Sequence, residues 1–593
     1  MVRSRLNKTA KNGLTGGLLK GRYIVILLFI IGGLLLTVAD PRIQTTGVLG
    51  TETQHTSAKR LRRIANRKSK PICGKPKPNH FQCFAYASTK DNGDLFTAQP
   101  AVSGGFGPAE FHTAYNMPCT PGGSVSSICS TPGSYGPQTV AIVDAGNIAS
   151  GVENSVQAYN QQYGLPACTV ANGCLTIVNQ SGATSPLPSS QGFQWEVEIA
   201  MDVETVHMMC QTCKIVLVEA TTNSFANMAT AENTAASYNP VSISNSFGLE
   251  GTDVSSFDAA FTHPGIAVVV ATGDLGADPS GISWPADIPS VIAAAGTSLS
   301  LNVDNSWASE TVWLDSGGGC APAYSAPSWQ TSLAAWGANG CGSNRSYGDV
   351  SADANPSTGA AVYLAGTWYQ TGGTSLSTPI IASAFALVGS VPTGATASSI
   401  PYGSFTSANF HDVTSGNDCT FGGQTHCTAA VGFDTPTGLG TPNGLGGFSP
   451  PPSQPTGLTA TDIDQSHTSL SWTASTGNVN VNSYKIYRNN VLVGSSGSTS
   501  YTDSGLSPNV SYTYKVVAQD IVNNVSPAST TSSTTTYYKA DINQDTHINL
   551  LDFSLLASKF GQSGGSLGRS DLNADSTVNL LDFSLLASVY GIE

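Results

Sequence analysis

Short apolar runs alternate with stretches of helical length through the middle of the chain. Four runs rich in β-branched residues are expected to form buried strands, at residues 139–144, 214–219, 241–246 and 265–271. Continuous apolar strands that alternate with helices are typical of a parallel sheet covered on both faces. The pattern therefore predicts an α/β domain whose active site lies at the carboxyl ends of the strands.

Changes in composition divide the rest of the chain. A Pro-rich segment ends the α/β region, and beyond it come alternating strands of a small β-sandwich, then a near-identical repeat at 541–557 and 571–587. We expect an export segment (1–39), a basic linker or processing region (40–107), the α/β domain (108–448), a Pro-rich linker (449–455), the β-sandwich (456–530), a second linker (531–538) and the repeat domain (539–593).

The N-terminus has the pattern of an export signal. Basic residues precede an apolar run from Tyr23 to Ala39, and Asp40-Pro41 follows it. The run is close to the lower limit of about 17 residues for a spanning helix. It is either cleaved after Ala39 or retained as an anchor, and its length slightly favours retention. We expect an extracellular or cell-surface protein that contacts a membrane only through this segment.

Cysteine content and charge fit that location. The twelve cysteines form neighbouring couples, which are Cys73/Cys83, Cys119/Cys129, Cys168/Cys174, Cys210/Cys213, Cys320/Cys341 and Cys419/Cys427. An even number of closely spaced cysteines outside the cytosol predicts disulfides, although spacing does not prove connectivity and a zinc site at Cys210/Cys213 is an alternative. The net charge of −13 argues against nucleic acid as a partner and favours solubility and calcium.

A candidate nucleophile lies on a turn of small residues. Ser375 ends the sequence Gly372-Gly-Thr-Ser and precedes an apolar helix at 380–388. A serine at a helix start exposes its hydroxyl and leaves its backbone N–H free, as a nucleophile with half an oxyanion hole requires. A plain Gly/Ser-rich helix cap gives the same pattern, but the following Pro379 favours the catalytic interpretation. No histidine occurs in the glycine-rich turn that a subtilisin-type base would occupy.

Acidic residues offer an alternative base. Glu198 and Asp202 are four positions apart, so they share one face of a helix. A solvated acidic face is the usual explanation, but the residues around them are apolar and no Lys or Arg is near. Asp274 follows a buried strand between glycines, where it can point into an active site or simply cap a turn.

These motifs, in this order, resemble the sedolisin family of serine-carboxyl peptidases, which share a subtilisin-like fold of a parallel sheet sandwiched by helices. The resemblance covers roughly residues 108–446, and Ser244–Gly248 is similar to the family's substrate-binding strand. It implies a peptidase that acts on proteins or peptides. The implied roles are nucleophile for Ser375, general base for Glu198, orienting partner for Asp202 and oxyanion-hole acid for Asp274.

The chemistry of these groups predicts an acid preference. A glutamate with a pKa of about 4.3 accepts a serine proton only if burial and a neighbouring carboxyl raise its basicity. An aspartic acid donates to an oxyanion only while it is protonated. One departure concerns latency, because the family carries a long folded propeptide and only the linker-like residues 40–107 stand before the domain here.

The resemblance also implies one calcium site near the end of the peptidase domain. Its ligands are the carboxylates of Asp412 and Asp434 and the backbone oxygens of Val413, Ala430 and Gly432, which are the hard oxygen ligands that calcium prefers. Without the resemblance, the two aspartates would be ordinary turn residues.

Both C-terminal regions resemble known modules. A buried Trp472 and the Leu506-x-Pro508-x-x-x-Tyr512 arrangement resemble a fibronectin type III domain with its tyrosine corner. The repeats resemble dockerin-type calcium loops, with ligands at positions one, three, five, seven, nine and twelve. The two predicted sets are Asp541, Asn543, Asp545, His547, Asn549 and Asp552, and Asp571, Asn573, Asp575, Thr577, Asn579 and Asp582, with the carbonyl as ligand at position seven.

Position twelve of each loop is aspartate instead of glutamate, and position six lacks the glycine of an EF-hand; both departures fit the dockerin variant. We expect two calcium ions in the repeats. Cohesin binding is the implied role, and calcium-stabilised attachment or stability alone is an equal alternative. For the whole chain, the rivals of a peptidase are an inactive peptidase-fold binding or adhesion protein and a scaffolded polysaccharide-degrading component.

Overall fold

The computed structural model describes most of the chain beyond residue 67. The described ranges are 68–98, 104–118, 138–252, 254–339, 341–389, 391–392, 395–420, 426–477, 479–565 and 567–591. The predicted export segment and the Cys119/Cys129 couple lie outside these ranges. Within them, no helix combines the length and the apolar character needed to cross a bilayer.

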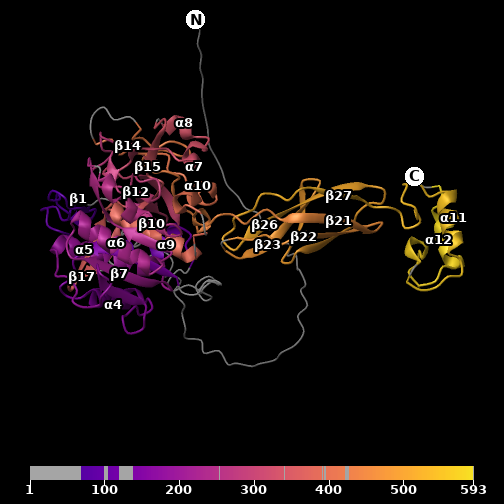
Figure 1. Cartoon of the computed structure of the whole chain (residues 1–593), viewed down its shortest axis with the longest axis horizontal. Coiled ribbons are helices and arrows are strands. Elements are labelled where there is room, and N and C mark those ends of the chain that lie inside the picture. Colours follow the sequence, from indigo (N-terminus) through magenta and orange to yellow (C-terminus); the bar gives the residue numbers. More distant parts are fainter. Residues whose placement is uncertain are drawn as a thin grey trace, which may run out of the picture. The chain divides into compact units, whose positions relative to one another are not determined.

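An eight-stranded, mostly parallel sheet forms the centre of the α/β region (Figure 1). Its order is β13 (Trp307–Val312), β12 (Ile292–Leu301), β10 (Ala267–Ala271), β8 (Ser242–Asn245), β5 (Thr139–Ala145), β7 (Lys214–Ala220) and β6 (Leu175–Asn179), with β16 (Val350–Asp353) also paired to β12. Only β13 runs antiparallel to its neighbour. Successive side chains of a strand point to opposite faces, and nearly all those of β5, β7, β8 and β10 are buried. The sheet is therefore covered on both faces, which confirms the predicted α/β class.

The helices of this region cover the sheet. They are α2 (Pro108–Ala114), α4 (Val152–Tyr163), α5 (Phe193–Met209), α6 (Phe225–Ser237), α9 (Thr374–Val388) and the single-turn helices α7 (Ser328–Thr331), α8 (Trp336–Asn339) and α10 (Ile400–Gly403). Helices α5 and α9 pack against each other, α9 also packs on β8 and β10, and α6 packs on β5 and β7. Because α5 and α9 are buried around most of their circumference, polar side chains on them face protein and not water.

Smaller sheets complete the region. One contains β11 (Ser283–Trp284), β9 (Phe247–Glu250) and β2 (Gln82–Cys83), and another contains β1 (Lys68–Pro71), β3 (Tyr86–Thr89), β18 (Thr367–Gly372) and β17 (Ala360–Leu364), with β4 (Thr97–Ala98) on β18. Short pairs are β14 (Gly319–Ser325) with β15 (Asn344–Tyr347), and β19 (Phe410–His411) with β20 (Thr441–Pro442). The 3₁₀ turns are η1 (Ser255–Phe261), η2 (Ala397–Ser399) and η3 (Gly446–Phe448).

The expectation of a linker up to residue 107 is wrong for residues 68–98. These residues supply β1 to β4, and three of the strands pair with the α/β region, β2 with β9 and both β3 and β4 with β18. Phe81, Phe84 and Ala87 are at most 1% exposed. The segment is basic and contains prolines, and its apolar runs are short, so its sequence resembles a linker. Its strands form only by pairing with β9 and β18, which lie far along the chain.

Five of the predicted cysteine couples form disulfides, namely Cys73–Cys83, Cys168–Cys174, Cys210–Cys213, Cys320–Cys341 and Cys419–Cys427. The disulfide at Cys210–Cys213 takes both thiolates that the alternative zinc site would need.

The β-sandwich has two antiparallel sheets. They consist of β21 (Thr456–Asp464), β22 (His467–Thr473) and β25 (Ser500–Ser504), and of β24 (Val491–Ser496), β23 (Val481–Arg488), β26 (Ser511–Asp520) and β27 (Ser532–Thr535). Trp472 is buried against Tyr484, as predicted. The backbone N–H of Ser507 donates to the hydroxyl oxygen of Tyr512 at 3.0 Å, which is the expected tyrosine corner.

Each C-terminal repeat consists of a loop and a short helix. The helices α11 (Leu550–Ser558) and α12 (Leu580–Ser588) contact each other, and η4 (Gly568–Ser570) lies between them in sequence. Asn549 and Asn579 cap the two helices in the same way, with the side chain accepting from the second backbone N–H of the helix. Near-identical sequence thus gives the same local structure twice.

Candidate active site

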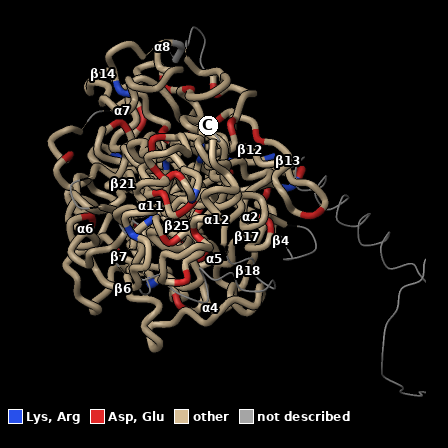
Figure 2. The backbone as a smooth tube through the Cα atoms, turned by 90° about the vertical axis from the view of Figure 1, so that its right-hand side faces the viewer, with Lys and Arg blue, Asp and Glu red and all other residues tan. Residues whose placement is uncertain are grey.

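Helix α5 carries two buried carboxyl groups. Glu198 and Asp202 are both 0% exposed, because their face of α5 lies in the protein interior. Oδ1 of Asp202 accepts a hydrogen bond from the Ser246 hydroxyl at 2.8 Å. Oε1 of Glu198 and Oδ2 of Asp202 have no hydrogen-bond partner. Figure 2 shows that Asp and Glu positions are scattered along the tube. Several other acidic side chains are also buried, among them Asp144, Glu219 and Glu232.

Ser375 lies in the first turn of α9. The residue that caps this helix, Gly373, can only be glycine. Gly373 caps the helix with φ of 101°, and a Cβ there would overlap the carbonyl oxygen of Phe84 and lie 2.7 Å from Oδ2 of Asp274. The Ser375 hydroxyl donates to the carbonyl oxygen of Ser246 at 3.1 Å. The turn before α9 thus needs a small residue because the Phe84 carbonyl and the Asp274 carboxyl group approach it closely.

Pro379 explains why the Ser246 hydroxyl also lies near the backbone carbonyl of Ser375. A proline has no backbone N–H, so the Ser375 carbonyl, four residues earlier, lacks its helical donor. The Ser246 hydroxyl lies 3.3 Å from that carbonyl oxygen and 2.8 Å from Asp202 Oδ1. One hydroxyl proton serves one of these acceptors at a time. Ser246 therefore connects Asp202 to the helix turn that carries Ser375.

Electrostatics couples these groups. Burial raises the pKa of Glu198 well above its usual value, and the carboxylates of Asp202, Asp144 and Asp274 raise it further, while the nearby Ser375 side chain opposes the increase. Burial also raises the pKa of Asp202, and its hydrogen bond with Ser246 opposes this. Two close, buried carboxyl groups cannot both ionise readily.

Asp274 lies just beyond β10 and contacts Thr374, the residue before Ser375. Its Oδ1 accepts from both the backbone N–H and the hydroxyl of Thr374, each at 2.8 Å, while its Oδ2 has no partner. Burial raises the pKa of Asp274 well above its usual value, against the effect of the Thr374 hydrogen bonds. A protonated Oδ2 would be a free donor in the space beside Gly373.

The structure thus brings together all four residues that the motifs singled out, and it adds one that they missed. Asp144 is the sixth residue of β5, is 0% exposed, and has no hydrogen-bond partner on either carboxylate oxygen. Burial raises its pKa, as do Asp202 and Glu219, its cross-strand neighbour on β7. The available signal was an acid at the carboxyl end of an otherwise apolar strand.

The Ser375 backbone N–H is not free, contrary to the prediction. Sequence reasoning required this group to be free, but it donates to the Phe84 carbonyl oxygen at 3.2 Å. The donor of the predicted oxyanion hole is therefore already in use by another part of the same chain.

The predicted calcium ligands of the α/β region lie around one loop. Oδ2 of Asp412 accepts from the Gly432 N–H at 2.9 Å, and Oδ2 of Asp434 accepts from the Ala430 N–H at 2.8 Å. Burial raises the pKa of Asp434 to about 7, and the nearby Asp412 carboxylate adds to the increase. A cation between the two carboxylates would relieve this cost, and each oxygen keeps a lone pair for it, so the two carboxylates fit calcium. The Val413 carbonyl stays a predicted ligand.

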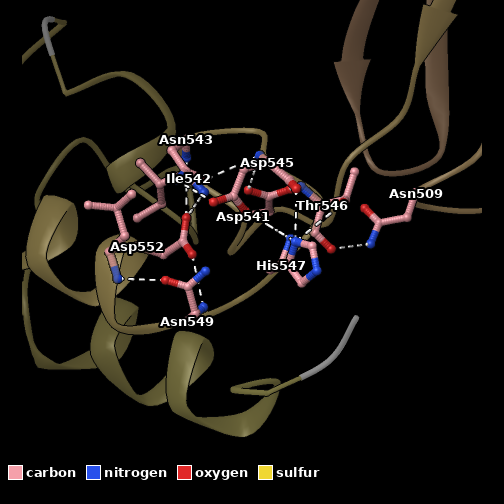
Figure 3. A network of polar contacts seen from close by, with 10 residues as sticks. Asn509, Asp541, Ile542, Asn543, Asp545, Thr546, His547, Asn549 and Asp552 are labelled. Atoms are coloured by element: carbon pink, nitrogen blue, oxygen red, sulfur yellow. Dashed lines mark hydrogen bonds and ion pairs between the residues drawn. The ribbon is translucent and has the colours of Figure 1, made fainter.

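Figure 3 shows the loop of the first repeat, with its acidic side chains turned toward one another. Oxygen atoms of Asp541, Asp545 and Asp552 all lie within 4.8 Å of each other. Oδ1 of Asp552 accepts from the Ile542 N–H at 2.7 Å, and Oδ2 accepts from the Asn549 N–H at 2.9 Å (Figure 3). The position-twelve aspartate thus closes the loop, and the three carboxylates fit a divalent cation.

The second loop repeats this arrangement. Oδ1 of Asp582 accepts from the Leu572 N–H at 2.7 Å, and Oδ2 accepts from the Asn579 N–H at 2.8 Å. The residues at position six, Thr546 and Ser576, have φ of 75° and 67°. The loops therefore keep the left-handed turn of an EF-hand without its glycine, at some cost in backbone strain.

Comparisons with known proteins match different regions of this chain. A model of the fibronectin type III domain matches residues 453–535, and a model of the dockerin type I domain matches residues 528–588. Sedolisin from Pseudomonas sp. (strain 101) is 28% identical over 381 residues, which are 58% of this chain and 61% of that protein. Kumamolisin from Bacillus sp. (strain MN-32) is 29% identical over 339 residues, which are 52% of this chain and 59% of that protein.

A solved structure gives a similar match. Pseudomonas sedolisin, described as a serine-carboxyl proteinase complexed with two molecules of pseudo-iodotyrostatin, has 27% sequence identity and a TM-score of 0.47, covering 57% of this chain and 96% of that one. The chain spans about three fifths of the length of the two curated relatives. The chain is therefore similar to the sedolisins over somewhat more than half of its length, and it matches the fibronectin type III and dockerin type I models in its C-terminal part.

Proposed function

We propose that the α/β region is an exported serine-carboxyl endopeptidase that acts on proteins or peptides and favours acid. The observation that carries the proposal is the pair of fully buried carboxyl groups, Glu198 and Asp202, coupled to the hydroxyl of Ser375 with no histidine in between. Homology to the sedolisins supports the same reaction class.

Each side chain has one role in the proposed reaction. Glu198 takes the proton of Ser375 as its Oγ attacks the scissile carbonyl carbon, and Asp202 shares a proton with Glu198 and holds it in place. The oxyanion accepts from the Ser375 backbone N–H and from protonated Asp274. Glu198 returns the proton to the leaving amine, and water then hydrolyses the acyl-enzyme by the reverse proton path.

The two raised pKa values set opposite limits on the working range. Glu198 accepts a proton only when it is ionised, so its pKa sets the lower pH limit, and Asp274 donates only while it is protonated, so its pKa sets the upper limit. The acid preference of the proposal is the fall in activity expected as pH rises through the Asp274 pKa.

Casein hydrolysis after prolonged incubation in acid tests the proposal. Wild type should hydrolyse casein, and Ser375→Ala and Glu198→Gln should not. Glu196→Gln is a matched control, because Glu196 lies on the same helix but only accepts from the Ala149 N–H at the helix start. A wild type as inert as Ser375→Ala would favour an inactive binding or adhesion protein.

We infer a second function for the dockerin domain, which is calcium-dependent attachment to a cohesin-type partner. Helices α11 and α12 expose matching apolar side chains that their own domain does not cover. These are Leu550, Leu551, Phe553 and Leu555, and Leu580, Leu581 and Leu585, each between 36% and 75% exposed. Apolar exposure on this scale in a small domain is typical of a binding surface.

Calorimetric titration with recombinant cohesin domains tests this role. Binding should require calcium and should be lost when Leu551→Asp and Leu581→Asp are combined. If calcium raises the melting temperature and no cohesin binds, the repeats serve stability alone.

A further inference from the structure

The turn that carries Asp274 is fastened through the backbone of its neighbours. The carbonyl oxygen of Gly273 accepts from the Gly317 N–H at 2.8 Å, and the carbonyl oxygen of Leu275 accepts from the Thr420 hydroxyl at 2.8 Å. Gly273 has φ of 110°, in the left-handed region that favours glycine. The position of the Asp274 side chain therefore depends on contacts made by the residues on either side of it.

Glu250, the last residue of β9, contacts both of these neighbours. Its Oε1 accepts from the Leu275 N–H at 3.0 Å. A Cβ on Gly273 would overlap the same Oε1 and would lie 2.8 Å from the Glu250 Cδ atom. The Glu250 carboxyl group thus lies against the backbone on both sides of Asp274, and the missing side chain at position 273 makes this approach possible.

The carboxyl group of Glu250 is shielded from water. Its Oε2 is buried and has no hydrogen-bond partner. Burial raises the pKa of Glu250 to about 8, and the nearby Asp278 carboxylate adds to the increase, while the hydrogen bond from Leu275 opposes it. In acid Glu250 is therefore neutral, with its proton on Oε2, and Oε1 still accepts from the Leu275 N–H.

The charge of Glu250 acts on Asp274. Burial is the main reason that the pKa of Asp274 is raised, and the carboxylates of Glu250 and Asp315 add to the increase. An ionised Glu250 disfavours a second negative charge beside it, so Asp274 keeps its proton to higher pH. Tyr86 on β3 and Tyr347 on β15 also interact with Glu250, but burial raises the pKa of both phenols, so they stay neutral.

We propose that Glu250 is a positioning residue of the peptidase, which holds the Asp274 side chain toward the oxyanion through the Leu275 N–H. The proposal rests on the proposed peptidase function and adds a residue to its machinery. Because Glu250 acts through a group that is needed in the transition state, its loss should lower kcat more than it changes KM. Its charge also helps to set the pH above which Asp274 stops donating.

Two substitutions separate the contact from the charge. Glu250→Gln keeps an oxygen acceptor for the Leu275 N–H and removes the charge, whereas Glu250→Ala removes both. At the acid optimum, kcat should stay within about threefold of wild type in Glu250→Gln and fall by at least about tenfold in Glu250→Ala, with KM within about threefold in both.

The alkaline limb of the kcat profile is a readout that a purely structural contact would not move. Glu250→Gln should shift this limb to lower pH by at least about half a unit, because Asp274 loses the neighbouring charge. In an Asp274→Asn background the same change should shift nothing, since asparagine has no proton to lose. Asp278→Asn is a matched control on the same loop, because the Asp278 carboxylate accepts from the Ser280 N–H at 2.7 Å, beyond the Asp274 turn.

The full chain is assayed on a quenched fluorescent peptide between about pH 3 and about pH 9, with the melting temperature of each variant as the check on folding. Equal losses of kcat in Glu250→Gln and Glu250→Ala, with an unchanged limb, would reduce Glu250 to a structural residue and overturn the inference. Wild-type kcat in both variants would overturn it too. If Glu250→Ala does not fold, the limb of Glu250→Gln decides alone.

The failure of this inference and that of the peptidase function differ in the same assay. An active wild type, an inactive Ser375→Ala and an unshifted Glu250→Gln limb would remove the role of Glu250 and leave the peptidase function standing. An inert wild type would remove both proposals.

Discussion

Replacement of Asp274 by asparagine separates the donor role of this residue from its charge. In the structure Oδ1 accepts two hydrogen bonds from Thr374 and Oδ2 is unpartnered. An asparagine of the same shape keeps the accepting oxygen and places an N–H₂ group where Oδ2 lies. Asp274→Asn should therefore keep a donor for the oxyanion at every pH, while Asp274→Ala removes it and leaves the Thr374 N–H without its acceptor.

The expected sizes differ clearly. Loss of one oxyanion donor costs about 10²–10³ in kcat, or about 3–4 kcal/mol of transition-state stabilisation, which is the loss expected for Asp274→Ala. Asp274→Asn should lose much less at the wild-type optimum, by about tenfold or below, because a neutral amide is a weaker donor than a carboxylic acid.

The pH dependence gives the sharper test. Burial raises the pKa of Asp274, so the acid is protonated below that raised value and wild-type activity falls as pH rises through it. Asparagine has no proton to lose, so this alkaline decline should move to higher pH or vanish.

The assay is kcat and KM for a quenched fluorescent peptide, from about pH 3 to about pH 9. An Asp274→Asn variant as weak as Asp274→Ala, or one with an unchanged alkaline limb, would refute the assigned role.

Three further predictions concern stability. Glu232 is 0% exposed, and burial raises its pKa to about 8. The folded protein therefore keeps a proton that the unfolded chain releases near pH 4, so the free energy of unfolding falls as pH rises between these two values. Glu232→Gln should reduce the difference in urea unfolding free energy between pH 4 and pH 7 by about 3 kcal/mol. Asp349 forms a two-bond ion pair with Arg345 in which both side chains are 0% exposed, so Asp349→Ala should cost about 3–5 kcal/mol in the same assay, with exposed Asp304→Ala as the inert control. Calcium at about 100 times its dissociation constant should stabilise the dockerin domain by about 5 kcal/mol, or about 2.7 kcal/mol for each of its two loops, in thermal unfolding of chelator-treated protein. Asp541→Ala with Asp571→Ala should abolish the effect, and an unchanged melting temperature of the wild type would contradict the loop assignment.

Short-range features of this protein were set by its sequence. Apolar runs predicted the parallel sheet because burial on both faces leaves no polar alternation. The five disulfides join cysteines at most 21 positions apart, within the couples that spacing indicated. The i,i+4 spacing of Glu198 and Asp202 placed both carboxyls on one face of α5, and the repeated loop sequence predicted a repeated loop structure.

Tertiary structure decided whatever depends on partners far along the chain. Residues 68–98 looked like a linker because a strand of two to four residues has no pattern of its own, and only pairing with β9 and β18 orders it. The same pairing brings the Phe84 carbonyl to the Ser375 N–H, which sequence reasoning had taken to be free. Asp144 gained its place beside Asp202 because a parallel sheet gathers the ends of distant strands at one edge, and no local sequence records which ends will meet.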